Sequence, residues 1–125
     1  MASFDEQVEF TRKYAQLAID QHIKYGIPAS VTLAQMALES TWGTSDLARF
    51  GNNFFGIKAS TSWLSQNLPY STHDDDYLSE KFCNFSTPLE SMEYHSKILM
   101  SNRYRRCWNY GPTDYHNWLV EIKAA

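Results

Sequence analysis

Several patterns that mark large protein classes are missing from this chain of 125 residues. No apolar run approaches the roughly 20 residues of a membrane-spanning helix, so we expect no membrane span. The segment Met1–Glu6 has neither the basic part nor the apolar core of a signal peptide. The sequence shows no internal repeat and no low-complexity linker, and its length fits one domain covering residues 1–125.

Cysteine and metal-ligand patterns are also sparse. Cys83 and Cys107 are the only two cysteines and form no C-x-x-C pair, which argues against a thiolate zinc site. A disulfide between them requires an exported protein. We expect two buried free thiols instead, because a domain of this size needs no covalent link. His22, His95 and His116 fall in three different predicted helices without ligand spacing, so we expect no metal and no other cofactor.

Positive charge is limited. The chain has 11 Lys and Arg against 14 Asp and Glu, and its net charge of −3 argues against a protein that binds nucleic acid phosphates. The local exception is the cluster Arg103, Tyr104, Arg105 and Arg106. We interpret it first as the solvated end of a helix, where cations are favourable. The second interpretation is a contact for an anionic polymer, including cell-wall carboxylates.

The first part of the chain predicts two helices. Apolar residues recur at helical spacing over 4–25, Gly26 ends this helix, and Pro28 prevents its continuation. Ser30 is placed to cap a second helix over 31–42. That segment is apolar around much of its circumference, which is typical of a buried helix.

The rest of the chain predicts a small lobe followed by two helices. Residues 44–58 indicate a short helical piece, a tight turn and a packed return. The polar stretch 59–79 indicates an irregular β-hairpin, with its last strand at 81–85. A capping box predicts a helix over 87–101, and a last helix begins near Asp114.

Glu39 is the strongest candidate for chemistry. It lies near the end of an otherwise apolar predicted helix, where Leu38 and Trp42 can reduce its solvation. Low solvation and the negative end of a helix dipole both disfavour a carboxylate anion. A carboxylic acid that keeps its proton near neutral pH is what protonation of a glycosidic oxygen requires. The alternative is a Glu at a helix end that bonds to nearby backbone or to Lys58.

The segments around Glu39 match a known signature. Glu-Ser-Thr-Trp-Gly at 39–43 and Asn-Asn-Phe-Phe-Gly-Ile-Lys at 52–58 closely resemble the signature of glycoside hydrolase family 73, the bacterial endo-β-N-acetylglucosaminidases that cut peptidoglycan. The match is weak between 60 and 79. It is present again at Phe82, 88–91, 94–95, 103–104, 114–115 and 118–125.

The resemblance implies a fold and a set of site residues. The fold is lysozyme-like and mainly α (α+β): a helical domain with a small β-hairpin lobe and a groove between the two. Glu39 matches the family's catalytic acid. Asn53, Phe54 and Gly56 match its cleft-floor motif, and Tyr104 matches its cleft tyrosine. We therefore expect Glu39 to be catalytic and the other four to bind substrate.

The family's second carboxylate lies in the β lobe, where the match is weakest. The candidates are Asp74, Asp75, Asp76 and Glu80. We choose Asp76, with Asp75 next and Glu80 third, because side chains alternate along a strand and only one of the two aspartates can face the groove. Such a carboxylate would activate water or steady the acetamido group of the sugar. The alternative is a solvated hairpin tip or an incidental cation site.

Other residues complete the set of candidates. We include Trp42 and Trp63 among the expected substrate-binding residues. The alternatives are that Trp42 packs beneath Glu39 instead of lining the cleft, and that Trp63 fills the core instead of stacking on a sugar. Ser40 lacks the Gly-x-Ser-x-Gly surroundings of a nucleophilic serine. The chain stops just before the family's usual Gly-Tyr-Ala-Thr segment and final helix, so we expect part of the cleft wall to be missing after Ala125.

The predicted function is hydrolysis of the β-1,4 bond on the reducing side of N-acetylglucosamine in peptidoglycan glycan strands, by inverting or substrate-assisted catalysis. The alternatives are a muramidase or lytic transglycosylase of the same superfamily, a wall-binding module without catalysis, and a glycoprotein-directed endoglycosidase. We expect a monomer that is extracellular, periplasmic or attached to the cell wall. Without a signal peptide, the chain is either a trimmed piece or an enzyme released by another route, as phage lysins are.

Overall fold

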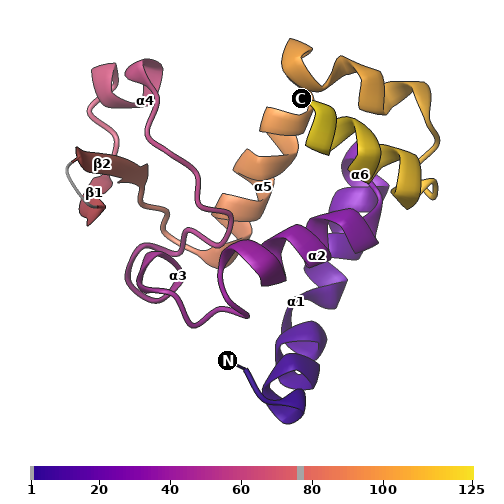
Figure 1. Ribbon diagram of the computed structural model, residues 1–125, viewed down its shortest axis with the longest axis horizontal. Helices are drawn as coiled ribbons and strands as arrows, with labels where there is room; N and C mark the ends of the chain where they lie inside the picture. The colour runs from indigo at the N-terminus through magenta and orange to yellow at the C-terminus, as the bar shows by residue number, and fades with distance from the viewer. Residues whose placement is uncertain (1, 76–77) are drawn as a thin grey trace.

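Helices dominate the structure, and a two-stranded hairpin stands apart from them. The computed structural model describes residues 2–75 and 78–125. Its elements are α1 (Phe4–Tyr25), α2 (Ala29–Glu39), α3 (Asp46–Gly51), α4 (Thr61–Ser65), β1 (Tyr70–Asp75), β2 (Leu78–Cys83), α5 (Pro88–Leu99), the 3₁₀ helix η1 (Asn102–Asn109) and α6 (Tyr115–Ala124). Figure 1 shows the hairpin and α4 on one side, and α5, η1 and α6 on the other. The predicted fold class is therefore confirmed.

The first helix begins and ends where the sequence predicts. Ser3 and Glu6 form a capping box at its start, in which each side chain accepts a hydrogen bond from the other residue's backbone N–H. Gly26 ends the helix in the left-handed conformation, with φ at 82°, which a glycine adopts without a steric penalty. The chain then turns and returns as α2, which packs along α1.

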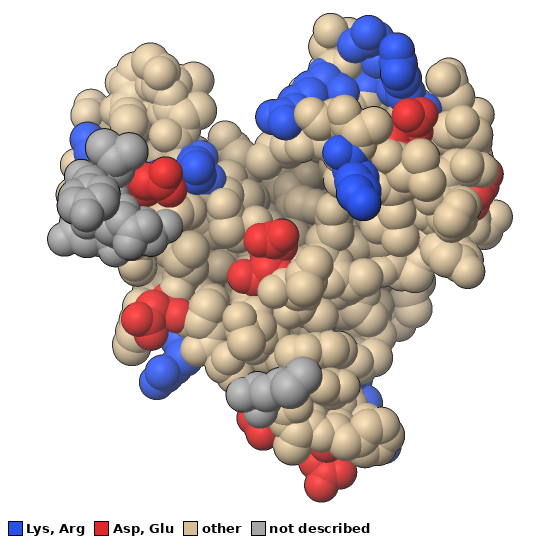
Figure 2. Space-filling view, viewed as in Figure 1, with Lys and Arg blue, Asp and Glu red and all other residues tan. Residues whose placement is uncertain are grey.

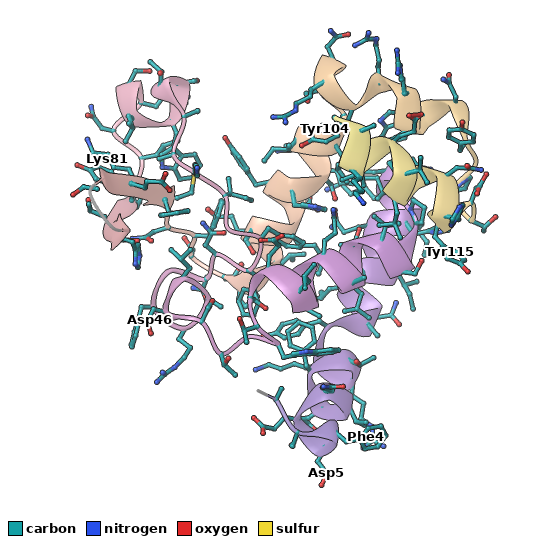
Figure 3. The ribbon with its side chains drawn as sticks, in the orientation of Figure 1. Phe4, Asp5, Asp46, Lys81, Tyr104 and Tyr115 are labelled. Carbon is teal, nitrogen blue, oxygen red and sulfur yellow. The ribbon has the colours of Figure 1, made fainter. Side chains whose placement is uncertain are left out.

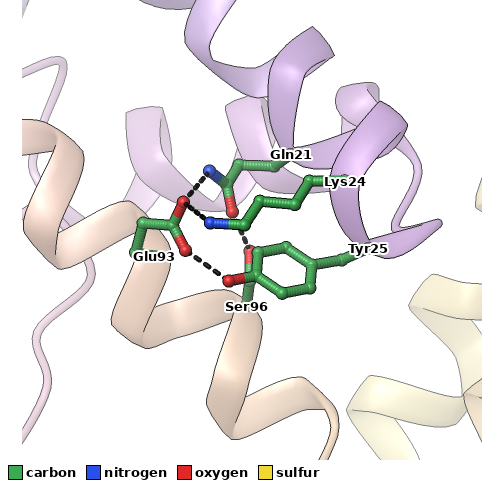
Figure 4. Close-up of polar contacts among 5 residues, drawn as sticks. All are labelled: Gln21, Lys24, Tyr25, Glu93 and Ser96. Atoms are coloured by element: carbon green, nitrogen blue, oxygen red, sulfur yellow. Dashed lines mark hydrogen bonds and ion pairs between the residues drawn. The ribbon is translucent and has the colours of Figure 1, made fainter.

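A polar network joins α1 to α5 (Figure 4). The Glu93 carboxylate accepts hydrogen bonds from Gln21 Nε2 (3.1 Å), Lys24 Nζ (2.9 Å) and the Tyr25 hydroxyl. Gln21 is buried, and its Oε1 accepts a hydrogen bond from Ser96 Oγ at 2.7 Å. Burial opposes ionisation of Glu93, but these donors outweigh burial and lower its pKa to about 2. The network fixes how α5 lies on α1.

The second helix differs from the prediction at its start and in its exposure. It begins at Ala29, so Ser30 lies inside the helix and is not its cap. Leu38 is 77% exposed. The helix is therefore buried on one side and open on the other, and the prediction of a helix buried around most of its circumference is wrong.

The second helix also ends three residues earlier than predicted, at Glu39 instead of Trp42. The Ser40 hydroxyl donates to the Met36 carbonyl oxygen (2.6 Å) and accepts from the Gly43 N–H (2.8 Å). The two residues after Ser40 have positive φ angles of 51° and 55°. A short polar side chain that bonds to nearby backbone competes with helix propagation in this way. Glu39 is consequently the last residue of the helix.

The lobe contains more helix than predicted, and its last strand begins and ends earlier in the sequence than predicted. The helix α4 occupies part of 59–79, where the sequence predicts an irregular hairpin. β1 and β2 form an antiparallel pair, but β2 ends at Cys83, because the Phe85 N–H donates to the Gly51 carbonyl oxygen (2.8 Å). An isolated β-bridge at Lys58 joins the loop before α4 to β2.

The C-terminal part follows the prediction except in one segment. Thr87 caps α5, which ends at Leu99, two residues before the predicted end. Asp114 caps α6, as expected. The basic cluster 103–106 lies in η1, a separate 3₁₀ helix with a kink at Tyr104, and not at the end of the preceding helix. This helix was not predicted, because its sequence is mostly polar and offers no apolar period.

Two apolar clusters form the core. The larger one joins α1, α2 and α5 to the lobe, and the smaller one joins α6 and η1 to the start of α2. The buried members are Phe10, Tyr14, Met36, Ala37, Ala48, Phe54, Phe55, Ile57, Trp63, Cys83, Phe85 and Met92 in the larger cluster, and Ile27, Val31, Leu99, Cys107 and Trp118 in the smaller.

Cys83 and Cys107 are free and buried, as predicted. In residues 2–75 and 78–125, no helix is long and apolar enough to cross a membrane.

Candidate active site

A hollow of about 260 Å³ opens where the lobe meets the helices. Figure 2 shows it near the centre of the molecule, between the lobe and the C-terminal helices. Its walls come from α2, the loop before the lobe, α5, η1 and α6. Two predicted site residues, Glu39 and Tyr104, are in this set. The lining residues are Gln35, Glu39, Phe55, Ile57, His95, Ile98, Leu99, Tyr104 and Ile122.

Glu39 lies at the edge of the hollow with its side chain exposed. The prediction that Leu38 and Trp42 desolvate it is wrong: Leu38 points to solvent, and Trp42 packs against α1. The alternative partner Lys58 is engaged elsewhere, in an ion pair with Glu80 at 3.3 Å. Within the described residues, the Glu39 side chain has no hydrogen bond or ion pair. The carboxyl is therefore free to meet a ligand.

Gly56 lies next to the carboxyl of Glu39. A Cβ atom built at Gly56 would lie 3.6 Å from Glu39 Oε2, and the residue has φ at +65°. Only glycine adopts that conformation readily. The backbone of the loop can therefore pass close to the carboxyl. This placement agrees with the predicted position of Gly56 at the cleft.

Asn53 and Phe54 lie beneath the site and not in it. Asn53 is 1% exposed, and its Nδ2 donates to the carbonyl oxygens of Ile57 (2.9 Å) and Cys83 (3.0 Å). Its Oδ1 accepts from the backbone N–H groups of Phe55 (3.3 Å) and Ile57 (3.0 Å). Phe54 is buried in the core. The expectation that these two residues contact substrate is therefore corrected: they hold the loop whose next residues line the hollow.

Gln35 and His95 form a polar pair in the wall of the hollow that the sequence did not single out. His95 Nε2 lies 2.8 Å from Gln35 Oε1, and the imidazole stacks on Phe55 at 4.1 Å between centroids. Gln35 precedes Glu39 by four residues, so both point from the same face of α2. That spacing could have revealed Gln35. His95 carried no such signal, because its place depends on α5 packing against α2.

The buried imidazole decides which way the Gln35 amide faces. Burial lowers the pKa of His95 to about 4, so the ring is neutral near pH 7. Its Nδ1 is buried without a partner among the described residues. An unpaired buried N–H is rarer than an unpaired acceptor, so the proton belongs on Nε2. The Nε2–H then donates to Gln35 Oε1, and the Gln35 NH₂ group remains as a free donor in the wall of the hollow.

Of the three aromatic residues predicted to bind substrate, one lines the hollow and two do not. Tyr104 lines the hollow, and Figure 3 shows it on the far side of the opening from the lobe residue Lys81. Trp42 instead packs edge-on against Phe10 of α1, at 5.5 Å between centroids. Trp63 is 6% exposed and its Nε1 donates to a backbone carbonyl oxygen at 2.8 Å. The expectation that the two tryptophans bind substrate is corrected: neither lines the hollow.

The second carboxylate falls in the part of the lobe that is described least. Asp76, the first choice, lies outside the described residues. For Asp75, the backbone is described: it is the last residue of β1 and pairs with Leu78. Glu80 pairs across the hairpin with His73 and carries the ion pair to Lys58. Among the described residues, no group of three His, Cys, Asp or Glu could hold a metal ion.

Solved structures share this architecture. The glycoside hydrolase domain of Salmonella typhimurium FlgJ aligns with a TM-score of 0.73 and 25% identity, over 94% of this chain and 75% of that one. The catalytic domain of the autolysin Auto from Listeria monocytogenes aligns with a TM-score of 0.76 and 28% identity, over 98% of this chain and 75% of that one. The fold is that of the lysozyme-like glycoside hydrolase domains.

The family follows from the sequence match. Residues 15–125 match the Glucosaminidase family, described as mannosyl-glycoprotein endo-beta-N-acetylglucosaminidase, and the chain belongs to this family. Exo-glucosaminidase LytG of Bacillus subtilis (strain 168) is 33% identical over 101 residues, covering 77% of this chain and 35% of LytG. Peptidoglycan hydrolase FlgJ of Escherichia coli (strain K12) is 33% identical over 97 residues, covering 70% and 30%. The chain thus spans about a third of these curated relatives.

Proposed function

We propose that this chain is a peptidoglycan hydrolase domain that cleaves the β-1,4 bond on the reducing side of N-acetylglucosamine, with Glu39 as general acid. The proposal rests on one observation. The Glu39 carboxyl lies at the hollow beside Gly56 and has no hydrogen-bond or ion-pair partner among the described residues. Such a group can reach a glycosidic oxygen. The curated relatives LytG and FlgJ, a glucosaminidase and a peptidoglycan hydrolase by name, support the same substrate.

Bound substrate supplies the desolvation that the free chain lacks. Glu39 is exposed in the structure, and the apolar side chains of Phe55 and Ile57 form the nearby wall. A sugar ring that lies against this wall displaces water from the carboxyl. Exclusion of water leaves the glycosidic oxygen as the group next to the carboxyl that it can protonate.

The Gln35 amide gives the hollow a preference for an acetamido sugar. Its free NH₂ group lies one helical turn before Glu39, and the bond from His95 holds it in place. An amide donor pairs well with the carbonyl oxygen of an N-acetyl group. We therefore assign Gln35 the role of orienting the sugar whose glycosidic bond is cleaved. The role of His95 is to position Gln35.

The second carboxylate remains Asp76 in this proposal, with Asp75 next and Glu80 third. In one form of the mechanism, this carboxylate activates a water molecule and the anomeric configuration inverts. In the other form, the acetamido oxygen of the substrate attacks, the configuration is retained, and the carboxylate steadies the acetamido group. Glu80 is the weakest of the three because Lys58 already neutralises its charge.

The proposal also covers the setting in which the domain works. Peptidoglycan lies outside the plasma membrane, so the enzyme acts in the periplasm, outside the cell or at the wall. The relative FlgJ, a peptidoglycan hydrolase by name, supports this location. We propose that the domain acts as a monomer on glycan strands.

The test compares the chain with its Glu39→Gln variant on purified bacterial sacculi, with the products analysed by mass spectrometry. Soluble fragments that end in reducing N-acetylglucosamine, released by the first protein and not by the second, are the expected result. The variant keeps the shape of the side chain, and a matched melting temperature shows that its fold is intact. Loss of general acid help lowers the rate by about 10² to 10⁴.

Other products would favour other members of the fold. An anhydro-muramic end would identify a lytic transglycosylase, and a reducing muramic end would identify a muramidase. Binding to sacculi without release of sugar would identify a wall-binding module. Release of N-glycans from a glycoprotein, with intact sacculi, would identify the activity that the family description names.

A further inference from the structure

A second, smaller cavity of about 140 Å³ lies next to the hollow and has cationic walls. Arg103, Arg105 and Arg106 line it together with Tyr104, and the acidic groups in its lining are Glu121 and the end of the chain at Ala125. Figure 2 shows Lys and Arg side chains gathered over η1 and α6, at the upper edge of the hollow. Tyr104 lines both cavities, so they are direct neighbours.

The arginines of this cavity keep most of their hydrogen-bond donors free. Arg103 donates from Nε (3.3 Å) and Nη2 (2.9 Å) to the Ala125 carbonyl oxygen. Arg105 donates once, to a backbone carbonyl oxygen at 3.1 Å. Arg106 has no side-chain partner among the described residues, and in that part of the chain neither Arg105 nor Arg106 forms an ion pair. A guanidinium has five N–H donors, so unused donors face the cavity and the solvent.

The chemistry of the cavity fits a carboxylate. Arg binds planar carboxylates with two parallel hydrogen bonds, and an exposed cluster with excess positive charge attracts anions. The sugar backbone of peptidoglycan is uncharged in this region, and its carboxylates belong to the peptide stems on the muramic residues. A strand that lies in the hollow carries such a stem within reach of the neighbouring cavity.

We propose that Arg105 and Arg106 bind the stem-peptide carboxylates of the same glycan strand that lies in the hollow. Arg103 and Tyr104 hold the shape of the cavity, since Tyr104 forms the wall between the two sites. This inference rests on the proposed function and extends it from the sugars to the peptide. A wall phosphate polymer is the weaker candidate, because its anions are not fixed beside the cleaved bond.

The test uses two forms of one substrate. Soluble glycan strands are freed of phosphate polymers, and half are then stripped of their stems by an amidase that cuts the bond between muramic acid and peptide. The muramic carboxylate that this cut frees is then converted to a neutral methyl amide, so that the stripped strands carry no carboxylate. The variant is Arg105→Gln with Arg106→Gln. The matched control is Arg12→Gln with Lys13→Gln, which removes two exposed cations from α1. We measure kcat and KM on both strands, and the affinity of each protein in a Glu39→Gln background.

On stem-bearing strands, the arginine variant is expected to raise KM and the dissociation constant by about three- to tenfold, with kcat unchanged. On stripped strands, the KM and dissociation constant of the arginine variant should equal those of the unmodified chain. The control variant should equal the unmodified chain on both kinds of strand. The proposal would be overturned if the arginine variant and the unmodified chain bound stem-bearing strands with equal affinity. It would also be overturned if the variant lost the same affinity for stripped strands as for stem-bearing strands. If binding depends on the stems but nothing is cleaved, the peptide site stands and the proposed catalytic function fails.

Discussion

Gly56 lies against the carboxyl of Glu39, so close that a Cβ atom on it would sit 3.6 Å from Glu39 Oε2. The φ angle of Gly56 is +65°, a conformation that costs a residue with a Cβ about 1–2 kcal/mol. We predict that Gly56→Ala lowers the free energy of unfolding by this amount. It should also lower kcat at temperatures where the variant is fully folded, because relief of the unfavourable φ angle shifts the loop that contacts the Glu39 carboxyl.

Gly111→Ala is the matched control for this prediction. A Cβ atom at Gly111 meets nothing within 4 Å, and the residue has no positive φ. Its melting temperature and kcat should equal those of the unmodified chain. A Gly56→Ala variant that is destabilised but keeps full kcat would show that the glycine serves the loop alone.

The two contacts of Gln35 can be tested separately: its Oε1 accepts from His95, and its NH₂ group is proposed to donate to the substrate. Gln35→Glu keeps an acceptor for the His95 Nε2–H but removes the NH₂ donor, so we expect nearly normal stability and a raised KM. Gln35→Met removes both and should also lower the free energy of unfolding by about 1 kcal/mol, because a buried donor loses its partner. Thermal melts and kinetics on sacculi would show this split. Gln16→Met, on the exposed face of α1, is the control.

A normal KM in the Gln35→Glu variant would remove Gln35 from substrate recognition. The charge of the new Glu, four residues before Glu39, adds repulsion between two anions on one helix face. Its effect should weaken as salt is raised, whereas the loss of the NH₂ donor should not. KM measured at two salt concentrations therefore separates the two causes.

Asn53 holds the loop through four hydrogen bonds, and its two donors go to carbonyl oxygens. Asn53→Asp keeps the shape but turns the donors into acceptors beside buried carbonyls. We predict a loss of about 3–5 kcal/mol, the cost of a buried unpaired charge, or a failure to fold. Denaturant unfolding measures it. Asn109→Asp, an exposed substitution with the same chemistry, should change stability by less than about 0.5 kcal/mol.

The case of Asn53 shows what the sequence could and could not predict. The periodic and capping signals located α1, α5 and α6, and the motif around Glu39 located the residue that we propose as the acid and its neighbour Gly56. Burial was the main source of error. A motif shows which residues occur together, but not whether a side chain faces the cleft, as Glu39 does, or supports it from below, as Asn53 does. The Gln35–His95 pair depends on a contact between distant segments, which no local pattern encodes.

Glu93 links stability to pH. Its folded pKa of about 2 lies below the ordinary glutamate value of 4.5, so its contribution to stability is fully present above pH 4.5 and is lost as pH falls toward 2. Glu93→Gln should weaken the contacts to Lys24 and Tyr25, lowering the free energy of unfolding at pH 7 by about 1–3 kcal/mol. The difference between the two proteins should shrink as pH falls from 4.5 toward 2. A difference that stays constant over this range would contradict the assignment of the shift to Glu93.

The lobe carboxylates can be ranked by single substitutions. If Asp76 is the second carboxylate, Asp76→Asn lowers kcat by about 10² to 10⁴, whereas Asp75→Asn has a smaller effect. Glu80→Gln removes only an exposed ion pair with Lys58, so stability should change by less than about 1 kcal/mol and activity little. A large loss of kcat in Glu80→Gln with normal activity in Asp76→Asn would transfer the role to Glu80.

The same variants distinguish the two forms of the mechanism. In the inverting form, the carboxylate activates water, and added azide can take the place of that water, so it should restore turnover of the inactive Asn variant and yield a glycosyl azide. In the substrate-assisted form, the acetamido oxygen is the nucleophile and the product anomer matches the substrate. NMR of the first-formed anomer decides between them. An inverted product would leave Gln35 with an orienting role alone, whereas a retained product would require its NH₂ group to release the acetamido oxygen before attack.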